Sequence, residues 1–436
     1  MMLSNWMPIK LWQNKVWQTQ LWQTQPWQSK VVLALIFFFP VLTTSVKDAG
    51  SAIFIILFVA GLIYAWPCWK IIESWEKRVL MGFVVFFLIL ILSLINTEDY
   101  STAVRKIERF IRLLAIVPIY LLLRRVGTET AKALYYGAAV GCLVLALQGL
   151  YFRYILGEQV VNGVYHKIIF GDTAILFSAC VATGLICLKP PKWQVIIGMV
   201  CIFVGIYASV LSVTRQSWLL IPLLVVVWLW FIRKSLNKKI WSMITVGLLG
   251  LTIIGITWMP STIKQGIDMG VADLKLYQTD KGAGSSWGAR LNMWRDAWTM
   301  FKQSPVLGVG IGDYTLERKR LISAKLAREG YAYGHAHSIY MHFLATTGVV
   351  GFVGLIICIF YLPLMAFNKC WGQSRTGRER FYALGGITTI VSFAAFGFSE
   401  GWLVRNPFVN DYALFVIVFM SSAAISATKN SVLEER

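Results

Sequence analysis

Long apolar stretches recur along most of this chain, and they constrain its fold more than any other feature. Of its 436 residues, 57% are hydrophobic and only 14% are charged, whereas soluble domains carry roughly 25% charged residues. The stretches are continuous rather than alternating, which indicates membrane-spanning helices instead of the strands of a barrel. We therefore expect an all-α integral membrane protein with about 12 transmembrane helices.

The expected spans are separated by short polar segments and by one long polar insert. They are Val31–Val46, Ala52–Pro67, Val79–Ile95, Phe110–Leu123, Ala133–Phe152, Ile168–Leu188, Trp193–Val213, Trp218–Ile232, Ile240–Met259, Ser338–Phe367, Phe381–Phe398 and Tyr412–Ala427. The chain then divides into a Trp-Gln repeat tail (1–30), helices 1–9 (31–259), a large, partly helical loop (260–337), helices 10–12 (338–427) and a second tail (428–436).

The distribution of Lys and Arg predicts how the chain is oriented. Outside the long loop, most of them fall in the segments on the side of the two termini, and such an excess marks the cytoplasmic side. We therefore expect both termini in the cytoplasm of a bacterium, the protein in its inner membrane, and loop 260–337 in the periplasm. Because ATP is absent there, a reaction at this face needs an activated donor already attached to lipid.

The net charge of +20 points to anionic lipids or a phosphate-bearing partner. It is scattered between spans instead of forming one basic domain, so we expect no nucleic-acid partner. The tail repeats Trp-Gln at Trp12, Trp17, Trp22 and Trp27, and such Trp residues favour the lipid interface.

A histidine cluster ends the loop, in the run Gly334–His342 at the start of the tenth span. It holds three of the four histidines of the chain, His335, His337 and His342. Histidine exchanges protons near neutral pH, and His337 stands at the predicted boundary of water and lipid, so it is the candidate general base. His342 is expected to be a packed core residue, and the role of His335 stays open.

The spacing of these histidines argues against a metal site. On a helix, His335 and His337 would point to opposite sides, and neither they nor the pair His337 and His342 have the four-residue spacing that places two histidines on one metal. We therefore expect neither a bound metal nor another cofactor.

The loop also carries two predicted helices. In the first, Leu291, Trp294, Trp298 and Phe301 share one face, and Pro305 ends it. Gly308–Asp313 predicts a tight turn, and the second helix runs from Tyr314 to about Glu329. Its basic side chains form either a solvated face or a contact for acidic sugars or phosphates.

Isolated arginines near the ends of the spans are candidate phosphate ligands. Arg215 stands between two apolar spans with no other charge nearby in sequence, and Arg290 precedes the first loop helix. A guanidinium fork matches phosphate oxygens, although an arginine near a span end can also snorkel to the interface. Arg105, Arg109 and Arg112 form a basic stripe that either anchors its helix at the interface or contacts anionic lipid.

Three stretches of this sequence resemble the Wzy_C superfamily of O-antigen ligases and O-antigen polymerases, which are membrane glycosyltransferases. They are Arg215 at the start of a span, Arg290–Trp298 followed by Pro305–Gly310, and His337–Gly351. The chain departs from the common pattern at Ser338, where family members often have Asn, and at Thr346-Thr347, where they often have an acidic residue.

The resemblance implies metal-independent glycosyl transfer from a polysaccharide on undecaprenyl pyrophosphate, and in a ligase the acceptor is lipid A–core. His337 would be the general base, while Arg215 and Arg290 would bind the pyrophosphate. An O-antigen polymerase that extends lipid-linked glycan is the first alternative, and a protein O-oligosaccharyltransferase is the second. A lipid-linked sugar transporter is a different class, and the sparse charges within the spans argue against it.

Overall fold

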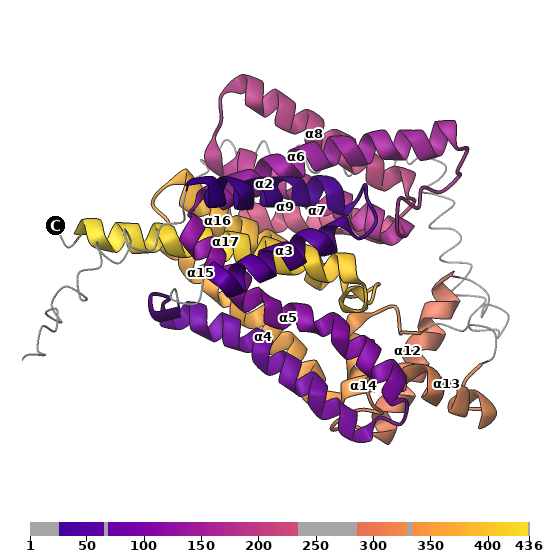
Figure 1. The fold of residues 1–436 in the computed structure, drawn as a ribbon. Coiled ribbons are helices and arrows are strands. Elements are labelled where there is room, and N and C mark those ends of the chain that lie inside the picture. The colour runs from indigo at the N-terminus through magenta and orange to yellow at the C-terminus, as the bar shows by residue number, and fades with distance from the viewer. Residues whose placement is uncertain (1–25, 65–68, 234–285, 329–333, 435–436) are drawn as a thin grey trace, which may run out of the picture.

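The protein is a bundle of helices with two short helices at one end, as the computed structural model shows (Figure 1). The structure describes residues 26–64, 69–233, 286–328 and 334–434. Every regular element in these ranges is helical, which confirms the all-α fold class. The Trp-Gln repeats at Trp12, Trp17 and Trp22, the ninth expected span and the beginning of the loop lie outside the described residues.

The helices follow the apolar stretches of the sequence. The elements before the loop are α2 (Pro26–Thr43), α3 (Ala49–Tyr64), α4 (Ser74–Leu92), α5 (Tyr100–Val126), α6 (Glu129–Leu150), α7 (Lys167–Leu188), α8 (Lys192–Leu211) and α9 (Arg215–Ile232). The loop supplies α12 (Ser286–Gln303) and α13 (Tyr314–Ser323), and α14 (Ile339–Gly354), η7 (Leu355–Tyr361), α15 (Leu362–Gln373), α16 (Gly377–Phe396), η8 (Trp402–Val404) and α17 (Asn406–Glu434) follow.

Every expected span within the described residues overlaps one of these helices. Seven helical segments in the described ranges are long and apolar enough to cross a membrane, while α2 and α3 are shorter apolar helices. The protein is therefore a helical membrane protein, and among the described residues fewer helices meet the length and composition criterion than the 12 expected for the whole chain.

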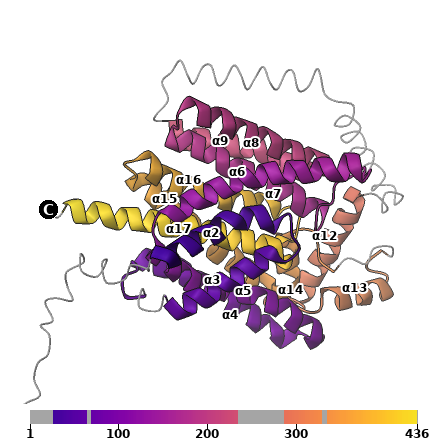
Figure 2. The ribbon, with the colours of Figure 1, turned by 45° about the horizontal axis from the view of Figure 1, so that its top comes forward.

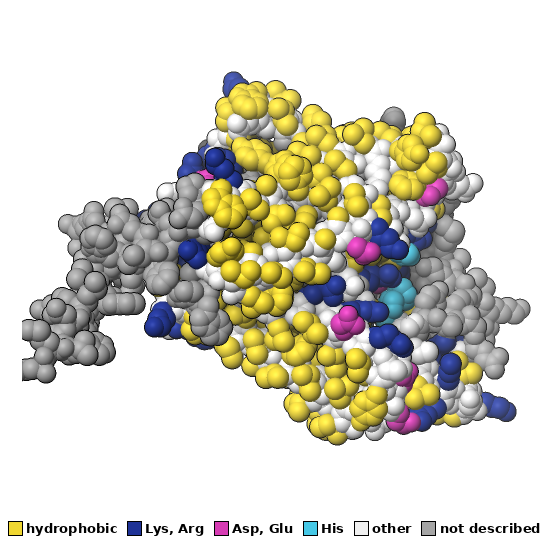
Figure 3. All heavy atoms as spheres, viewed as in Figure 1, with side chains coloured by type: hydrophobic (Ala, Val, Ile, Leu, Met, Phe, Trp, Pro, Cys, Tyr) yellow, Lys and Arg dark blue, Asp and Glu magenta, His cyan; other side chains and the backbone are white. Residues whose placement is uncertain are grey.

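Two helices form the centre of the bundle and two lie at its periphery. The apolar parts of α7 and α17 are 89% and 94% buried, against 28% for α8 and 17% for α9. Figure 2 also shows α17 running out of the middle of the bundle towards the chain terminus marked C. On the face seen in Figure 3, apolar side chains cover the middle, and charged side chains gather towards the two ends. This distribution suits a bundle surrounded by lipid.

The loop helices α12 and α13 lie at the end of the bundle opposite the terminus marked C (Figure 1); we call this the insert end. The predicted turn is present, with positive φ at Gly308 and Gly310. Its Val309 and Gly310 amides donate to the carbonyls of Ala345 and Thr346 in α14, at 3.0 and 3.1 Å. The turn therefore packs directly on the transmembrane part of the chain.

The loop is also held by the segment before α5. The Asp313 carboxylate accepts the backbone amides of Glu98 and Asp99, at 2.6 and 2.8 Å. The Arg320 guanidinium forms a bidentate pair with Glu98, at 2.7 and 2.6 Å. These contacts fix α13 on the bundle, which the sequence did not predict.

Two expectations for the loop helices need correction. The buried face of α12 is formed by Ala289, Met293, Ala297 and Met300, while Trp298 on the predicted apolar face is 47% exposed. Helix α13 ends at Ser323 rather than near Glu329. Its basic residues are not uniformly solvated, because Arg318 is buried with its Nε 3.1 Å from Asp296 Oδ2. This ion pair joins α13 to α12.

Candidate active site

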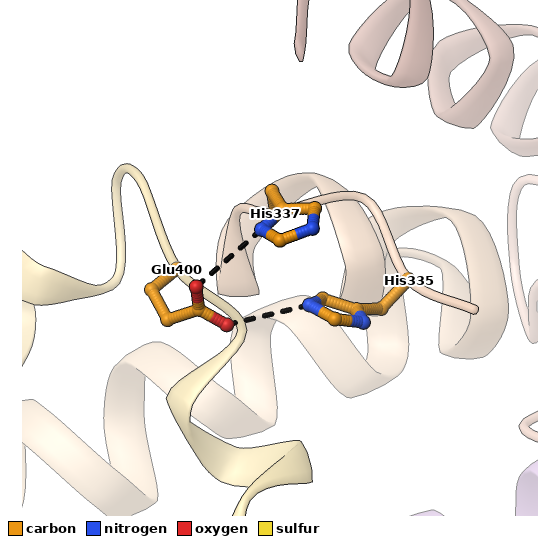
Figure 4. Close-up of side chains that lie close together, drawn as sticks. All are labelled: His335, His337 and Glu400. Carbon is orange, nitrogen blue, oxygen red and sulfur yellow. Dashed lines mark hydrogen bonds and ion pairs between the residues drawn. The ribbon is translucent and has the colours of Figure 1, made fainter. Parts of the chain in front are cut away.

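Glu400 is the centre of a group of charged and titratable side chains at the insert end (Figure 4). Its Oε2 lies 3.4 Å from Nδ1 of His337, and its Oε1 lies 3.3 Å from Nε2 of His335. The Arg405 Nε donates to the same Oε1 at 2.8 Å. Glu400 has no exposed surface, so a single buried carboxylate binds two histidines and an arginine.

The ends of two helices, α14 and α16, bring these residues together. The Ile339 amide, at the start of α14, donates to the Gly397 carbonyl at the end of α16, at 2.8 Å. The Ser338 hydroxyl donates to the same carbonyl at 3.3 Å and accepts the Met341 amide at the N-terminus of α14. His337 immediately precedes this junction and Glu400 follows it three residues after Gly397, so the junction sets their separation.

His337 itself adopts a backbone conformation that non-glycine residues rarely use. Its φ is +45°, in the left-handed region that costs roughly 1–2 kcal/mol for most L-residues. Strained residues of this kind persist where the surroundings determine them strongly, and they are concentrated at functional sites.

The electrostatics of the group favour an ionised carboxylate. Burial alone would raise the pKa of Glu400, but the contacts with His335 and His337 and the charge of Arg405 outweigh it, and the pKa lies well below its usual range. For His335, burial is the largest effect and lowers the pKa, while Glu400 acts in the opposite direction. Glu400 is thus negatively charged at neutral pH, and its carboxylate faces Nδ1 of His337.

The structure contradicts the expected separation of His335 and His337. They were predicted to point to opposite sides, but they precede α14 and are not on a helix, and their ring centroids are 4.3 Å apart. Within the described residues, the ligand atoms of His335, His337 and Glu400 all lie within 4.8 Å of one another. Helical spacing was therefore the wrong basis for judging a metal site, and the chemistry of the donor set must decide.

The third histidine of the cluster has a different environment. His342 is 2% exposed, and its ring packs edge-on against Tyr314 of α13 at a centroid distance of 5.2 Å. This is the packed core position that the sequence predicts. His166 caps the start of α7, where its Nδ1 accepts the Ile168 amide at 3.3 Å.

Helix α12 connects the two predicted phosphate ligands with the histidine segment. Arg290 Nη2 donates to the Gln216 side chain at 3.4 Å, and Gln216 is the neighbour of Arg215 at the start of α9. One turn further along α12, Trp294 Nε1 donates to the Ala336 carbonyl at 3.1 Å. Ala336 lies between His335 and His337, so the structure ties Arg215, Arg290 and His337 together through their immediate neighbours.

A second strained turn precedes Arg215. Val213 has φ of +54°, which is a genuine outlier for a β-branched residue. The Thr214 hydroxyl donates to the Lys167 carbonyl at 3.0 Å, and Asp172 of α7 accepts hydrogen bonds from Gln216 and Ser217. Hydrogen bonds from residues on both sides of Arg215 therefore hold the N-terminus of α9 against α7.

The basic stripe of Arg105, Arg109 and Arg112 lies on α5, which packs against η8. Arg109 Nη1 donates to the Val404 carbonyl at 3.1 Å, between Glu400 and Arg405. The stripe thus contacts the segment that supplies the central carboxylate.

Glu400 and Arg405 are the site residues that the sequence analysis missed. Arg405 was used only as one of the basic residues that predict the membrane orientation, and Glu400 was not predicted to have a role. A signal was present, because Glu400 is the only acidic residue between Glu379 and Asp411, in a short loop joining two apolar segments. What the sequence could not supply was its proximity to His337.

Comparison with known proteins shows which family this chain resembles. Residues 197–356 match the Wzy_C family model, whose description is O-antigen ligase. This confirms the resemblance inferred from the sequence, and the matched residues contain Arg215, Arg290, His335 and His337.

The Wzy_C match ends before Glu400 and Arg405, so the site joins residues inside and outside it. The chain is also similar to a Haemophilus influenzae protein described only as an uncharacterized protein. The two are 27% identical over 361 residues, which cover 81% of this chain and 88% of that protein. The similarity therefore extends well beyond the residues that match the Wzy_C model.

Proposed function

We propose that the protein is an O-antigen ligase, which transfers a polysaccharide from undecaprenyl pyrophosphate to a sugar of lipid A–core in lipopolysaccharide biosynthesis. The observation that carries the proposal is the buried Glu400 carboxylate against Nδ1 of His337. The match to a family model described as O-antigen ligase supports the class of reaction.

In this proposal His337 is the general base. The ionised carboxylate of Glu400 favours the tautomer with the proton on Nδ1, which leaves the Nε2 lone pair available for an acceptor hydroxyl. When Nε2 takes the hydroxyl proton, Glu400 stabilises the imidazolium that forms. General-base catalysis of this kind contributes roughly 10²- to 10⁴-fold in rate.

Arg215 and Arg290 bind the pyrophosphate of the donor. The acceptor oxygen forms a bond with the anomeric carbon while the bond from that carbon to the pyrophosphate oxygen breaks. The electron pair leaves with undecaprenyl pyrophosphate, and the two guanidinium groups stabilise the added charge. Direct displacement inverts the anomeric configuration, and the arginines supply the positive charge that a metal ion provides in other glycosyl transfers.

The membrane setting suits two lipid-linked substrates. We place the insert end at the periplasmic face of the bacterial inner membrane, with both termini cytoplasmic. There the donor and the lipid A–core acceptor are held in the same leaflet, so each needs only lateral diffusion to reach the site.

A choice of acceptors tests the proposal directly. Purified protein in nanodiscs is given radiolabelled glycan on undecaprenyl pyrophosphate, together with lipid A–core. Labelled lipid A–core is the expected product with wild type, and none is expected with His337→Asn. Longer lipid-linked chains without labelled lipid A–core would instead assign the protein as a polymerase. Label on an added acceptor protein would indicate protein O-glycosylation.

A further inference from the structure

The basic stripe on α5 is a compact array of guanidinium groups beside the site. At 3.6 residues per turn, Arg105, Arg109 and Arg112 fall within about 60° of the helix circumference and span about 10 Å of its length. Next to them on the same helix, Val104 and Ile111 expose 61% and 48% of their surface. This part of α5 therefore presents an apolar strip and a basic strip side by side.

The hydrogen bonds of the stripe go to neutral oxygens. Arg105 donates to the Thr102 hydroxyl at 3.0 Å, Arg109 to the Val404 carbonyl at 3.1 Å and Arg112 to the Arg109 carbonyl at 3.4 Å. No ion pair in the part of the chain that the structure describes involves these three arginines. Two acids lie on or next to this part of α5. Asp99 caps the helix through the Thr102 amide at 3.0 Å, and Glu108, one turn before Arg112, interacts with Arg112 electrostatically.

The stripe is attached to the site through the chain between Glu400 and Arg405. Val404, whose carbonyl Arg109 binds, directly precedes Arg405. In Figure 3, Lys and Arg side chains gather around the His side chains that are visible at the insert end, where the apolar surface stops. A lipid lying against the apolar surface would place its phosphates on this basic border and its sugars towards the histidines.

We infer that Arg105, Arg109 and Arg112 bind the phosphate groups of the acceptor, a phosphorylated glycolipid that approaches from the membrane. The inference rests on the proposed function and extends it by assigning the acceptor its own phosphate site. The donor's pyrophosphate uses Arg215 and Arg290 on α9 and α12, whereas the stripe lies on α5 against η8. Guanidinium forks match phosphate oxygens in geometry and charge, and the contact of Arg109 places the bound phosphates next to the segment that carries Glu400.

A binding experiment tests the inference independently of glycosyl transfer. The protein carries His337→Asn, so that no reaction occurs, and is held in nanodiscs of neutral lipid. The probe is lipid A–core, with and without its phosphates. The test variant is Arg105→Gln/Arg112→Gln, which leaves the contact between Arg109 and Val404 intact. The matched control is Lys192→Gln/Lys369→Gln, which removes the same charge from exposed positions on α8 and α15.

We expect the test variant to raise the Kd for phosphorylated lipid A–core about tenfold or more, since each basic residue near a charged lipid contributes on the order of 1 kcal/mol. The control variant should change it less than twofold, and the dephosphorylated probe should bind wild type and variant equally weakly. An unchanged Kd for the phosphorylated probe, or equal losses for both probes, would overturn the inference.

Two further outcomes separate this inference from its alternatives. If the test variant loses affinity for vesicles of anionic phospholipid but keeps its affinity for the phosphorylated probe, the stripe binds bulk lipid and the inference is wrong. If binding depends on the phosphates but wild type transfers no glycan to lipid A–core, the proposed ligase function is wrong, while the assignment of the stripe as a phosphate-binding site is supported.

Discussion

His337 Nδ1 and Glu400 Oε2 are 3.4 Å apart, although α14, η7, α15 and α16 separate the two residues along the chain. These helices run away from the insert end and then back to it. Because the bond from the Ile339 amide to the Gly397 carbonyl joins their two ends, the base and its carboxylate are held by the bundle rather than by a flexible loop. The predictions for His337, Glu400 and metal removal depend on that arrangement.

Replacing His337 with Asn should abolish glycan transfer while preserving the fold. Asn tolerates the left-handed φ that His337 adopts, so this variant removes the base without the backbone cost that Ala would add. We expect kcat to fall roughly 10²- to 10⁴-fold with a melting temperature close to that of wild type. Retention of full transfer by correctly folded His337→Asn would rule out the general-base role.

Glu400→Gln should reduce kcat more than it changes the KM for the donor, because Glu400 acts through His337 and does not contact the donor in the proposed mechanism. Loss of the analogous carboxylate in a Ser-His-Asp triad costs about 10⁴-fold in kcat, and we expect at least about 10-fold here. The control is Glu129→Gln, whose carboxylate is 57% exposed and pairs with Lys132. A rise in donor KM alone would argue against a positioning role.

The contribution of Glu400 to stability should depend on pH in a defined direction. Its folded-state pKa lies well below the usual range, so the stability that it adds is present above the unfolded pKa of about 4.3 and is lost as the pH falls through the folded value. The difference in melting temperature between wild type and Glu400→Gln should therefore shrink as the pH falls below about 4, where the carboxylate becomes protonated. A difference that grows below about pH 4 would contradict this assignment.

Arg290→Lys should weaken use of the donor even though the charge is kept. A lysine ammonium is a point charge and does not reproduce the planar fork of donors that matches pyrophosphate. We expect kcat/KM for the donor to fall about tenfold or more, with acceptor KM unchanged. The control is Arg295→Lys, at an exposed position on the same helix. Equal effects of both variants would show that the change acts on α12 in general.

Removal of metal ions should leave transfer intact. The ligand atoms of His335, His337 and Glu400 are close enough to share a cation, so the experiment is a real test. Arg405 already provides a positive charge at Glu400 Oε1, and a dication there would have to displace it or accept its repulsion. We expect the same rate before and after EDTA treatment and dialysis. Loss of activity that Zn²⁺ or Mg²⁺ restores would contradict the proposed mechanism.

The sequence predicted the elements of this protein better than their contacts. Continuous apolar stretches are enough to place helices, and His337, Arg215 and Arg290 stand out because charged or titratable groups are rare beside such stretches. Periodicity identified the shared face of Leu291, Trp294, Trp298 and Phe301 but could not show that Asp296 is buried with Arg318. Glu400 was missed because its significance lies in its distance from His337, and such a distance depends on how α14 and α16 pack.

Helix α17 follows the other described helices in sequence and is the most enclosed of the apolar segments that the structure describes. Because synthesis proceeds from the N-terminus, its central place can be filled only after those helices have been made. Glu400 and Arg405 lie in the loop that leads directly into α17. When α17 packs into the bundle, the same step therefore brings the Glu400 carboxylate next to His337. A chain that stops short of α17 would lack the stable bundle and the completed site together, which ties catalytic competence to complete membrane insertion.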